Sequence, residues 1–299
     1  MKKRVVLLLV VAAITGIATL QSCQSSKNST ASKMLKFNLE KGKGYDYEMI
    51  INMNVGPSVQ MDMSNYYSMD VVADEGGTKT ISTTYDRFKM KMNAMGLDME
   101  VDTDKPLPSL GDDEKDPMKM MNKVLGAIKG RKFLMKIDAE GKVLEVSGLQ
   151  EMAASIADSF NIGADKKKEV EAEFSKQFNE KSMRDQFERV LYIFPNKEIK
   201  VGDTWKKTTN PGGEVGGTYT STYKVTDIEG DMVTLDEQSD IEGNTSKGID
   251  LKGKIKGTLV IDSNSGLVVT ADQDMDITAG KDGVTQHIKG KTKIKGKAR

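Results

Sequence analysis

Most of this sequence alternates apolar and polar residues with a period of two, a pattern that restricts the chain to long, half-buried strands. Tyr45, Tyr47 and Met49 share one face of such a strand, and the same spacing recurs almost to the C-terminus. Because successive side chains of a strand point to opposite faces, one face of each strand needs a cover. The sequence therefore predicts a large sheet with something packed along one side.

Glycine-containing turns separate the predicted strands, which indicates antiparallel neighbours joined by hairpins. A long hairpin is expected around residues 75–77, where a glutamate precedes two glycines. An acidic, proline-containing loop is expected at 102–115. The predicted strands cover residues 45–51, 59–71, 80–92, 97–101, 131–137, 142–146, 218–228, 232–241, 249–261, 267–277 and 284–295.

The centre of the chain, residues 147–194, changes to a helical period. Its first apolar stripe runs from Leu149 to Phe160 at i, i+3, i+4 and i+7, and two further helices follow before Pro195. Asp116 and Pro117 predict the start of another helix over 117–129. The predicted fold class is α+β: long antiparallel strands in a curved sheet or half-barrel, with the central helices packed on it.

The β-rich domain is expected to span residues 35–299, and it holds a weak internal similarity. Residues 133–143 and 258–268 both read as a strand, a turn led by aspartate and containing glycine, and a second strand. Two interpretations stay open. The chain either contains two related β halves, 35–146 and 199–299, or any hairpin with Asp and Gly looks like this.

The first 23 residues have the layout of a secretory signal. Lys2, Lys3 and Arg4 precede an apolar run at 5–20 that is shorter than the roughly 20 residues of a membrane-spanning helix. A small residue then precedes Cys23, as in the lipobox of bacterial lipoproteins. We therefore expect residues 1–22 to be a lipoprotein signal peptide, Cys23 to be acylated, and residues 23–34 to form a flexible tether.

Composition excludes several classes of partner and chemistry. The chain has one cysteine, so no disulfide can form within it. Its 44 basic and 44 acidic residues cancel, and removal of residues 1–22 takes away three cations. A charge this close to neutral argues against nucleic acid as a partner, because nucleic-acid-binding domains usually carry a basic excess.

No motif in the sequence specifies a reaction. His287 is the sole histidine, so a catalytic triad or zinc site lacks partners. The acidic group at 112–116 lies in a polar loop, and the Asp- and Gly-containing turn at 262–266 lacks the closing glutamate of a calcium loop. The glycine-rich segment 212–217 lacks the Lys-Ser/Thr of a phosphate-binding loop. We expect no catalytic residues, metal site or cofactor, and hence no enzyme.

Methionine is unusually frequent, with 19 residues against eight Phe and one Trp. Several methionines alternate with polar residues on neighbouring strands, and three interpretations stay open. They are ordinary inner-face packing, a pliable lining for an apolar ligand, or a soft site for Cu(I). The candidate ligand-binding residues are Met61, Met63, Met90 and Met92 on the strands and Met152, Ile156 and Phe160 on the first central helix.

Lysines also alternate, at 252–256 and 289–295. One interpretation is contact with anionic lipid headgroups or glycans beside a membrane. The other is a solvated strand face that protects the sheet against aggregation.

Three segments carry a resemblance to a known family: FNLEKG at 37–42, LYIFP at 191–195 and VGDTW at 201–205. With the methionine-rich strands, they resemble an uncharacterised lipoprotein family of Bacteroidetes. Long antiparallel strands with helices set against them are also similar to the LolA/LolB half-barrel, which by analogy implies lipid-linked cargo. Gln24 is not the aspartate that retains lipoproteins in the inner membrane. The resemblance thus implies an outer-membrane anchor facing the periplasm.

Two hypotheses for function follow. The first is a non-enzymatic envelope lipoprotein that binds an apolar or lipid-like ligand between sheet and helices. The alternative is a structural or protein-interaction module of the cell envelope. The sequence leaves the ligand and the oligomeric state open.

Overall fold

The computed structural model describes residues 32–94, 96–105, 125–158, 163–211, 216–245 and 247–299. The predicted signal peptide, Cys23, most of the tether, Phe160 and most of the helix predicted at 117–129 lie outside these ranges. Residues 125–128, at the end of that predicted helix, are helical.

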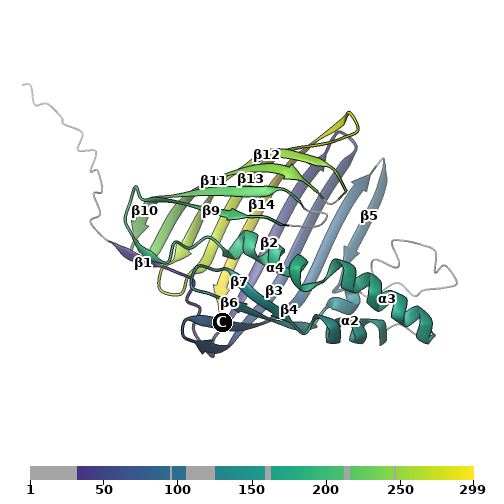
Figure 1. Cartoon of the computed structure of the whole chain (residues 1–299), viewed down its shortest axis with the longest axis horizontal. Helices are drawn as coiled ribbons and strands as arrows, with labels where there is room; N and C mark the ends of the chain where they lie inside the picture. The colour runs from purple at the N-terminus through teal and green to yellow at the C-terminus, as the bar shows by residue number, and fades with distance from the viewer. Residues whose placement is uncertain (1–31, 95, 106–124, 159–162, 212–215, 246) are drawn as a thin grey trace, which may run out of the picture.

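The fold is dominated by one curved antiparallel sheet of twelve strands (Figure 1). Its order is β7-β6-β4-β3-β2-β14-β13-β12-β11-β10-β9, and β5 pairs with the distal half of β4. The strands of this sheet are β2 (Gly44–Val55), β3 (Val59–Glu75), β4 (Thr78–Ala94), β5 (Leu97–Asp102), β6 (Lys132–Ile137), β7 (Val143–Ser147), β9 (Thr204–Thr209), β10 (Thr218–Glu229), β11 (Met232–Asn244), β12 (Asp250–Asp262), β13 (Leu267–Lys281) and β14 (Val284–Ala298). The predicted α+β class is confirmed.

The strands on either side of the helices belong to one continuous sheet. β2 and β14 join them through an antiparallel ladder that pairs Met49 with Ile294 and Ile51 with Thr292. The two similar hairpins occupy different positions in this sheet. The β6–β7 hairpin lies at one edge, whereas β12 and β13 lie in its interior.

Three helices gather on one side of the sheet: α2 (Leu149–Asp158), α3 (Ala164–Gln177) and α4 (Glu180–Leu191) (Figure 1). Asn179 caps α4 by accepting a hydrogen bond from the Ser182 amide at 2.9 Å. Met183, Phe187 and Leu191 then recur every four residues and are buried. α4 therefore lies with one apolar stripe against the rest of the protein.

A dense core extends from β6, β7 and the helices across the sheet to β10, β11, β12 and β13. A small sheet of β1 (Lys33–Leu35) and β8 (Lys197–Ile199) forms part of it. Phe37 and Phe194 pack there with ring centroids 5.9 Å apart, and both are fully buried. This core fixes the segments that enter and leave the helices.

The convex face of the sheet carries the alternating lysines, and carboxylates lie beside them. Lys254 pairs with Asp240 at 2.5 Å, and Lys291 pairs with Asp272 at 3.3 Å. These side chains are 45–66% exposed, so each pair contributes little stability. The pairs interleave opposite charges across neighbouring strands and keep this face in water.

No helix among the described residues is long and apolar enough to cross a membrane.

One glycine ties the β6–β7 turn to the end of α4. Gly141 has a φ of +84°, and a Cβ built there would lie 1.7 Å from the Leu191 carbonyl oxygen. We predict that Gly141→Ala lowers the free energy of unfolding by about 3 kcal/mol or more, since it adds a backbone clash to left-handed strain. Gly76→Ala is the control, because its φ is +62° but open space surrounds it. It should cost only about 1–2 kcal/mol. If urea unfolding shows an equal loss of unfolding free energy in the two variants, this packing is contradicted.

Candidate ligand-binding pocket

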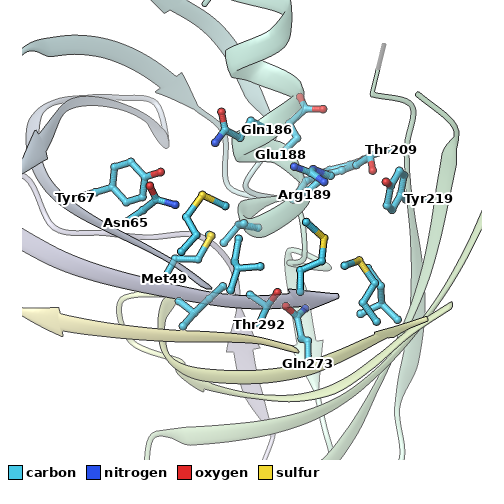
Figure 2. A pocket seen from close by; sticks show the side chains of 18 of the residues that line it. Met49, Asn65, Tyr67, Gln186, Glu188, Arg189, Thr209, Tyr219, Gln273 and Thr292 are labelled. Carbon is cyan, nitrogen blue, oxygen red and sulfur yellow. The ribbon is translucent and has the colours of Figure 1, made fainter. Parts of the chain in front are cut away.

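A cavity of about 480 Å³ lies between the concave face of the sheet and α4. Ligand pockets in proteins usually have volumes of about 300–1,000 Å³. Figure 2 shows Met49, Asn65 and Tyr67 at one side of it, Thr209 and Tyr219 at the other, and residues of α4 above. The apolar part of the lining includes Met49, Ile51, Met53, Met63, Met275 and Ile294.

Strand register brings the methionines together. Met275 lies opposite Gly290, Gly290 opposite Met53, Met53 opposite Met61, and Met61 opposite Met92. Gly290 leaves a gap in this row, and the Met275 methyl carbon would lie 3.0 Å from a Cβ added there. The absence of that one side chain lets Met275 reach toward β2, so thioethers from distant strands form one pliable surface.

Helix α4 covers the cavity. Its buried stripe faces the core, while Gln186, Glu188 and Arg189 line the pocket from above (Figure 2). Burial raises the pKa of the Glu188 carboxyl above its ordinary value. The roof therefore places polar groups over an apolar floor.

An aromatic cluster closes one end of the cavity. Tyr67 and Tyr85, both on the lining, have ring centroids 5.0 Å apart. Phe187 of α4 packs 6.0 Å from Tyr67 and 5.6 Å from Phe133. Burial raises the pKa of both tyrosine hydroxyls, so both stay neutral at physiological pH. This cluster holds α4 to β3, β4 and β6.

A second set of contacts holds the chain after α4 to β9. The Trp205 indole donates a hydrogen bond to the Ile193 carbonyl at 2.7 Å. Lys207 forms an ion pair with Glu140, and its ammonium lies 4.1 Å from the centre of the Tyr192 ring. Both sets of contacts therefore hold the C-terminal half of α4 and the residues that follow it beside the cavity.

The pocket has one polar corner, on β10, β11 and β13. Glu237 is only 6% exposed, and its two carboxylate oxygens accept hydrogen bonds from Ser239 at 2.7 Å and Gln273 at 2.5 Å. The hydroxyls of Ser239 and Ser221 lie 2.7 Å apart. All four side chains line the cavity, so this corner contrasts with the methionine surface beside it.

Paired charges form the wall at β4 and β5. Arg87 lines the pocket and contacts Asp102 in a bidentate arrangement, at 3.0 and 2.8 Å. The hydrogen bonds from Arg87 lower the pKa of Asp102 to about 2. Asp104 also contacts Arg87, and Lys129 pairs with Asp104 at 2.6 Å.

The side chains that line this pocket are suited to binding a ligand. No three His, Cys, Asp or Glu side chains of the described residues come together in a way that could hold a metal ion. The arrangement can hold an apolar molecule against the methionines while its polar group meets the corner at Glu237. The polar corner beside the apolar methionine surface gives such a molecule a defined orientation.

The structure distributes the candidate residues of the sequence analysis over different places. Met61, Met63, Met90 and Met92 lie on one face of β3 and β4, the face that bears the pocket, and Met63 is on its lining. Met92 borders a second hollow, near the β4–β5 hairpin. Met152 and Ile156 are not on the lining: they are 2% and 0% exposed in the core, because α2 packs at the β6 end. Phe160 lies outside the described residues.

The sequence analysis did not select the pocket's polar residues or its roof. Glu237, Ser239 and Gln273 face inward at positions where the strand alternation predicts apolar side chains. A charged residue at an inward position of a predicted strand was the signal that could have found Glu237. Met49, Met53 and Met275 follow the same alternation as the selected methionines.

Fold and pocket together define an open antiparallel half-barrel with a helix-covered internal cavity. Residues 76–268 match a family of unknown function, DUF6263, and the chain, of which this is more than half, belongs to that family. No curated protein matches the sequence.

Two solved structures are similar in part. A lipovitellin structure concerning lipid–protein interactions aligns with 88% of this chain at 11% identity and a TM-score of 0.47. The alignment covers 26% of the lipovitellin chain, so this chain spans about a quarter of that protein. A crystal structure of Pseudomonas aeruginosa OccK1 (OpdK) aligns with 86% of this chain and 67% of its own at 10% identity and a TM-score of 0.15.

The Arg87–Asp102 pair predicts a pH dependence of stability. The folded-state pKa of Asp102, about 2, lies below the unfolded value of about 3.9. Its stabilisation is therefore complete above about pH 4 and is lost as the pH falls through about 2. Asp102→Asn should cost about 1–2 kcal/mol at neutral pH and flatten the loss between about pH 4 and 2. The free energy of unfolding of both proteins is measured by urea unfolding at several pH values. If it falls in parallel for the two proteins as the pH is lowered, the pairing is contradicted.

Proposed function

We propose that this protein is a non-enzymatic lipoprotein of the cell envelope that binds an apolar or lipid-like molecule in the cavity beneath α4. One observation carries the proposal: a cavity of about 480 Å³ whose floor is formed by methionine and isoleucine side chains from β2, β3, β13 and β14. Protein interiors normally contain few voids larger than a water molecule. A cavity of this size and lining has the character of a ligand site.

The fixation of α4 supports this proposal. Phe187 in the aromatic cluster, and the Trp205 and Lys207 contacts to the residues after α4, hold the C-terminal half of the helix over the cavity. A ligand can then enter without the core having to open. Methionine side chains are unbranched and adapt to irregular shapes, so the floor can accommodate a flexible chain.

The N-terminal sequence supports a place beside a membrane. Acylation at Cys23 would hold the protein there, and the polar residues at 24–32 would form the tether before β1 begins at Lys33. The resemblance to Bacteroidetes lipoproteins, and Gln24 in place of the aspartate that retains lipoproteins in the inner membrane, favour the outer membrane, facing the periplasm. A protein held at a membrane surface lies close to the apolar molecules that such a cavity would bind.

The cavity can be blocked from its floor. Thr292 points into the pocket, and we predict that Thr292→Trp fills the space and lowers affinity for a fluorescent apolar probe at least tenfold, about 1.4 kcal/mol. Lys293→Trp is the matched control, since Lys293 is the next residue on β14 and its side chain is half-exposed on the other face. Native mass spectrometry of protein purified from membranes should show a bound lipid-like mass that only Thr292→Trp removes. If both variants behave alike, the cavity is not the binding site.

The proposed anchor has a separate test. Cys23→Ser removes the thiol that would be acylated, so the protein should move from the membrane fraction to the soluble fraction of cells. Mass spectrometry of the wild-type N-terminus should show acyl chains on Cys23. An unmodified cysteine and an unchanged distribution of the variant would contradict anchoring while leaving the pocket proposal standing.

A further inference from the structure

We infer that the pocket's polar corner selects the headgroup of the ligand, and that this headgroup is a protonated amine. The inference rests on the proposed function and gives it a substrate class: an apolar molecule with an amino group at one end. The observation behind it is Glu237 itself, a carboxylate almost wholly buried in the pocket's wall, whose hydrogen-bond partners among the described residues are all neutral.

The direction of each hydrogen bond at this corner follows from the chemistry of its groups. An ionised carboxylate only accepts, so Ser239 uses its one proton on Glu237 at 2.7 Å. Ser239 must then accept from Ser221, 2.7 Å away, and Gln273 spends an amide proton on the other carboxylate oxygen at 2.5 Å. Lone pairs of the Ser221 hydroxyl, the Gln273 carbonyl and the Glu237 carboxylate remain for the donors of a ligand, beside the second amide proton of Gln273.

The charge of Glu237 gives a reason for the donor to be cationic. Its side chain is almost wholly buried, yet its hydrogen-bond donors among the described residues are neutral, and it takes part in no ion pair there. Lys207, the buried lysine on the same wall, is paired with Glu140 and stacked on Tyr192. A buried charge without a counter-charge is unfavourable, and a ligand ammonium would supply one together with three donors.

The cations at the rim do not occupy this corner. Arg87 and Lys129 are held by Asp102 and Asp104 on the opposite wall. The Arg189 guanidinium lies 5.9 Å from the centre of the Tyr219 ring, at the roof. Gln273 is two residues from Met275 on β13, so a headgroup at the corner would direct its chain onto the methionine floor.

The test compares headgroups at constant chain length. Dodecylamine, dodecanol and dodecanoate are titrated against a fluorescent apolar probe bound to the full-length protein. Dodecylamine should displace the probe at a concentration roughly tenfold lower than dodecanoate does, since a charge-assisted hydrogen bond is worth about that factor. Glu237→Gln, which keeps the shape of the side chain, should bring this ratio to about one.

Two further variants keep the test decisive. Glu188→Gln removes another carboxylate of the same pocket, on the roof, and should leave the ratio intact. Ser221→Lys brings a protein ammonium to the corner and should abolish the amine preference even if Glu237→Gln fails to fold.

The outcomes separate the two proposals. Equal displacement by all three amphiphiles, or a ratio unchanged by Glu237→Gln and Ser221→Lys, overturns the headgroup assignment alone. Preference for dodecanoate overturns it as well. Failure of every amphiphile to displace the probe counts against the binding function itself.

Discussion

The sheet's apolar concave face is the constraint on which this structure depends. Twelve antiparallel strands present one such face, and in the described part of the chain three short helices are available to cover it. Over β6 and β7 the cover is complete, and the side chains form a dense core. Over β2, β13 and β14 helix α4 lies above the floor without filling the space beneath it, and a cavity of about 480 Å³ remains among the described residues. The pocket is thus the part of the apolar face that the described residues leave unfilled.

The same face is chemically divided along the sheet. Across β13, β14, β2 and β3 the inward positions carry methionine and isoleucine, which can change shape around a guest. Across β10 and β11 they carry Ser221, Ser239 and Glu237, whose hydrogen bonds fix one another. A buried polar network of this kind is costly unless each member is satisfied, and here the carboxylate of Glu237 has no counter-charge among the described residues. The division gives an amphipathic ligand one orientation.

Much of the fold follows from the sequence, because periods of two and 3.6 are local properties. Most strands of the large sheet, the three central helices and the turn at 75–77 lie where the pattern predicted them, whereas β1, β8 and β9 were not predicted. The pocket does not follow in the same way. Whether a helix stripe meets the core or roofs a cavity depends on register and packing, so Met152 and Met63 look equivalent in the sequence but lie in different environments. Glu237 differs, because the sequence shows a charged residue at an inward position of a predicted strand. Its partner Gln273 on β13 follows only from the strand pairing.

The central claim is that the methionine floor beneath α4 is the surface that meets a ligand. Nuclear magnetic resonance of protein labelled with ¹³C at the methionine methyl groups tests it most directly, during titration with dodecanol. The account predicts shifts at Met49, Met63 and Met275, which line the cavity, with Met135 and Met152 in the dense core unchanged. Unshifted pocket methyls, or shifts that spread equally to the core methionines, would contradict it.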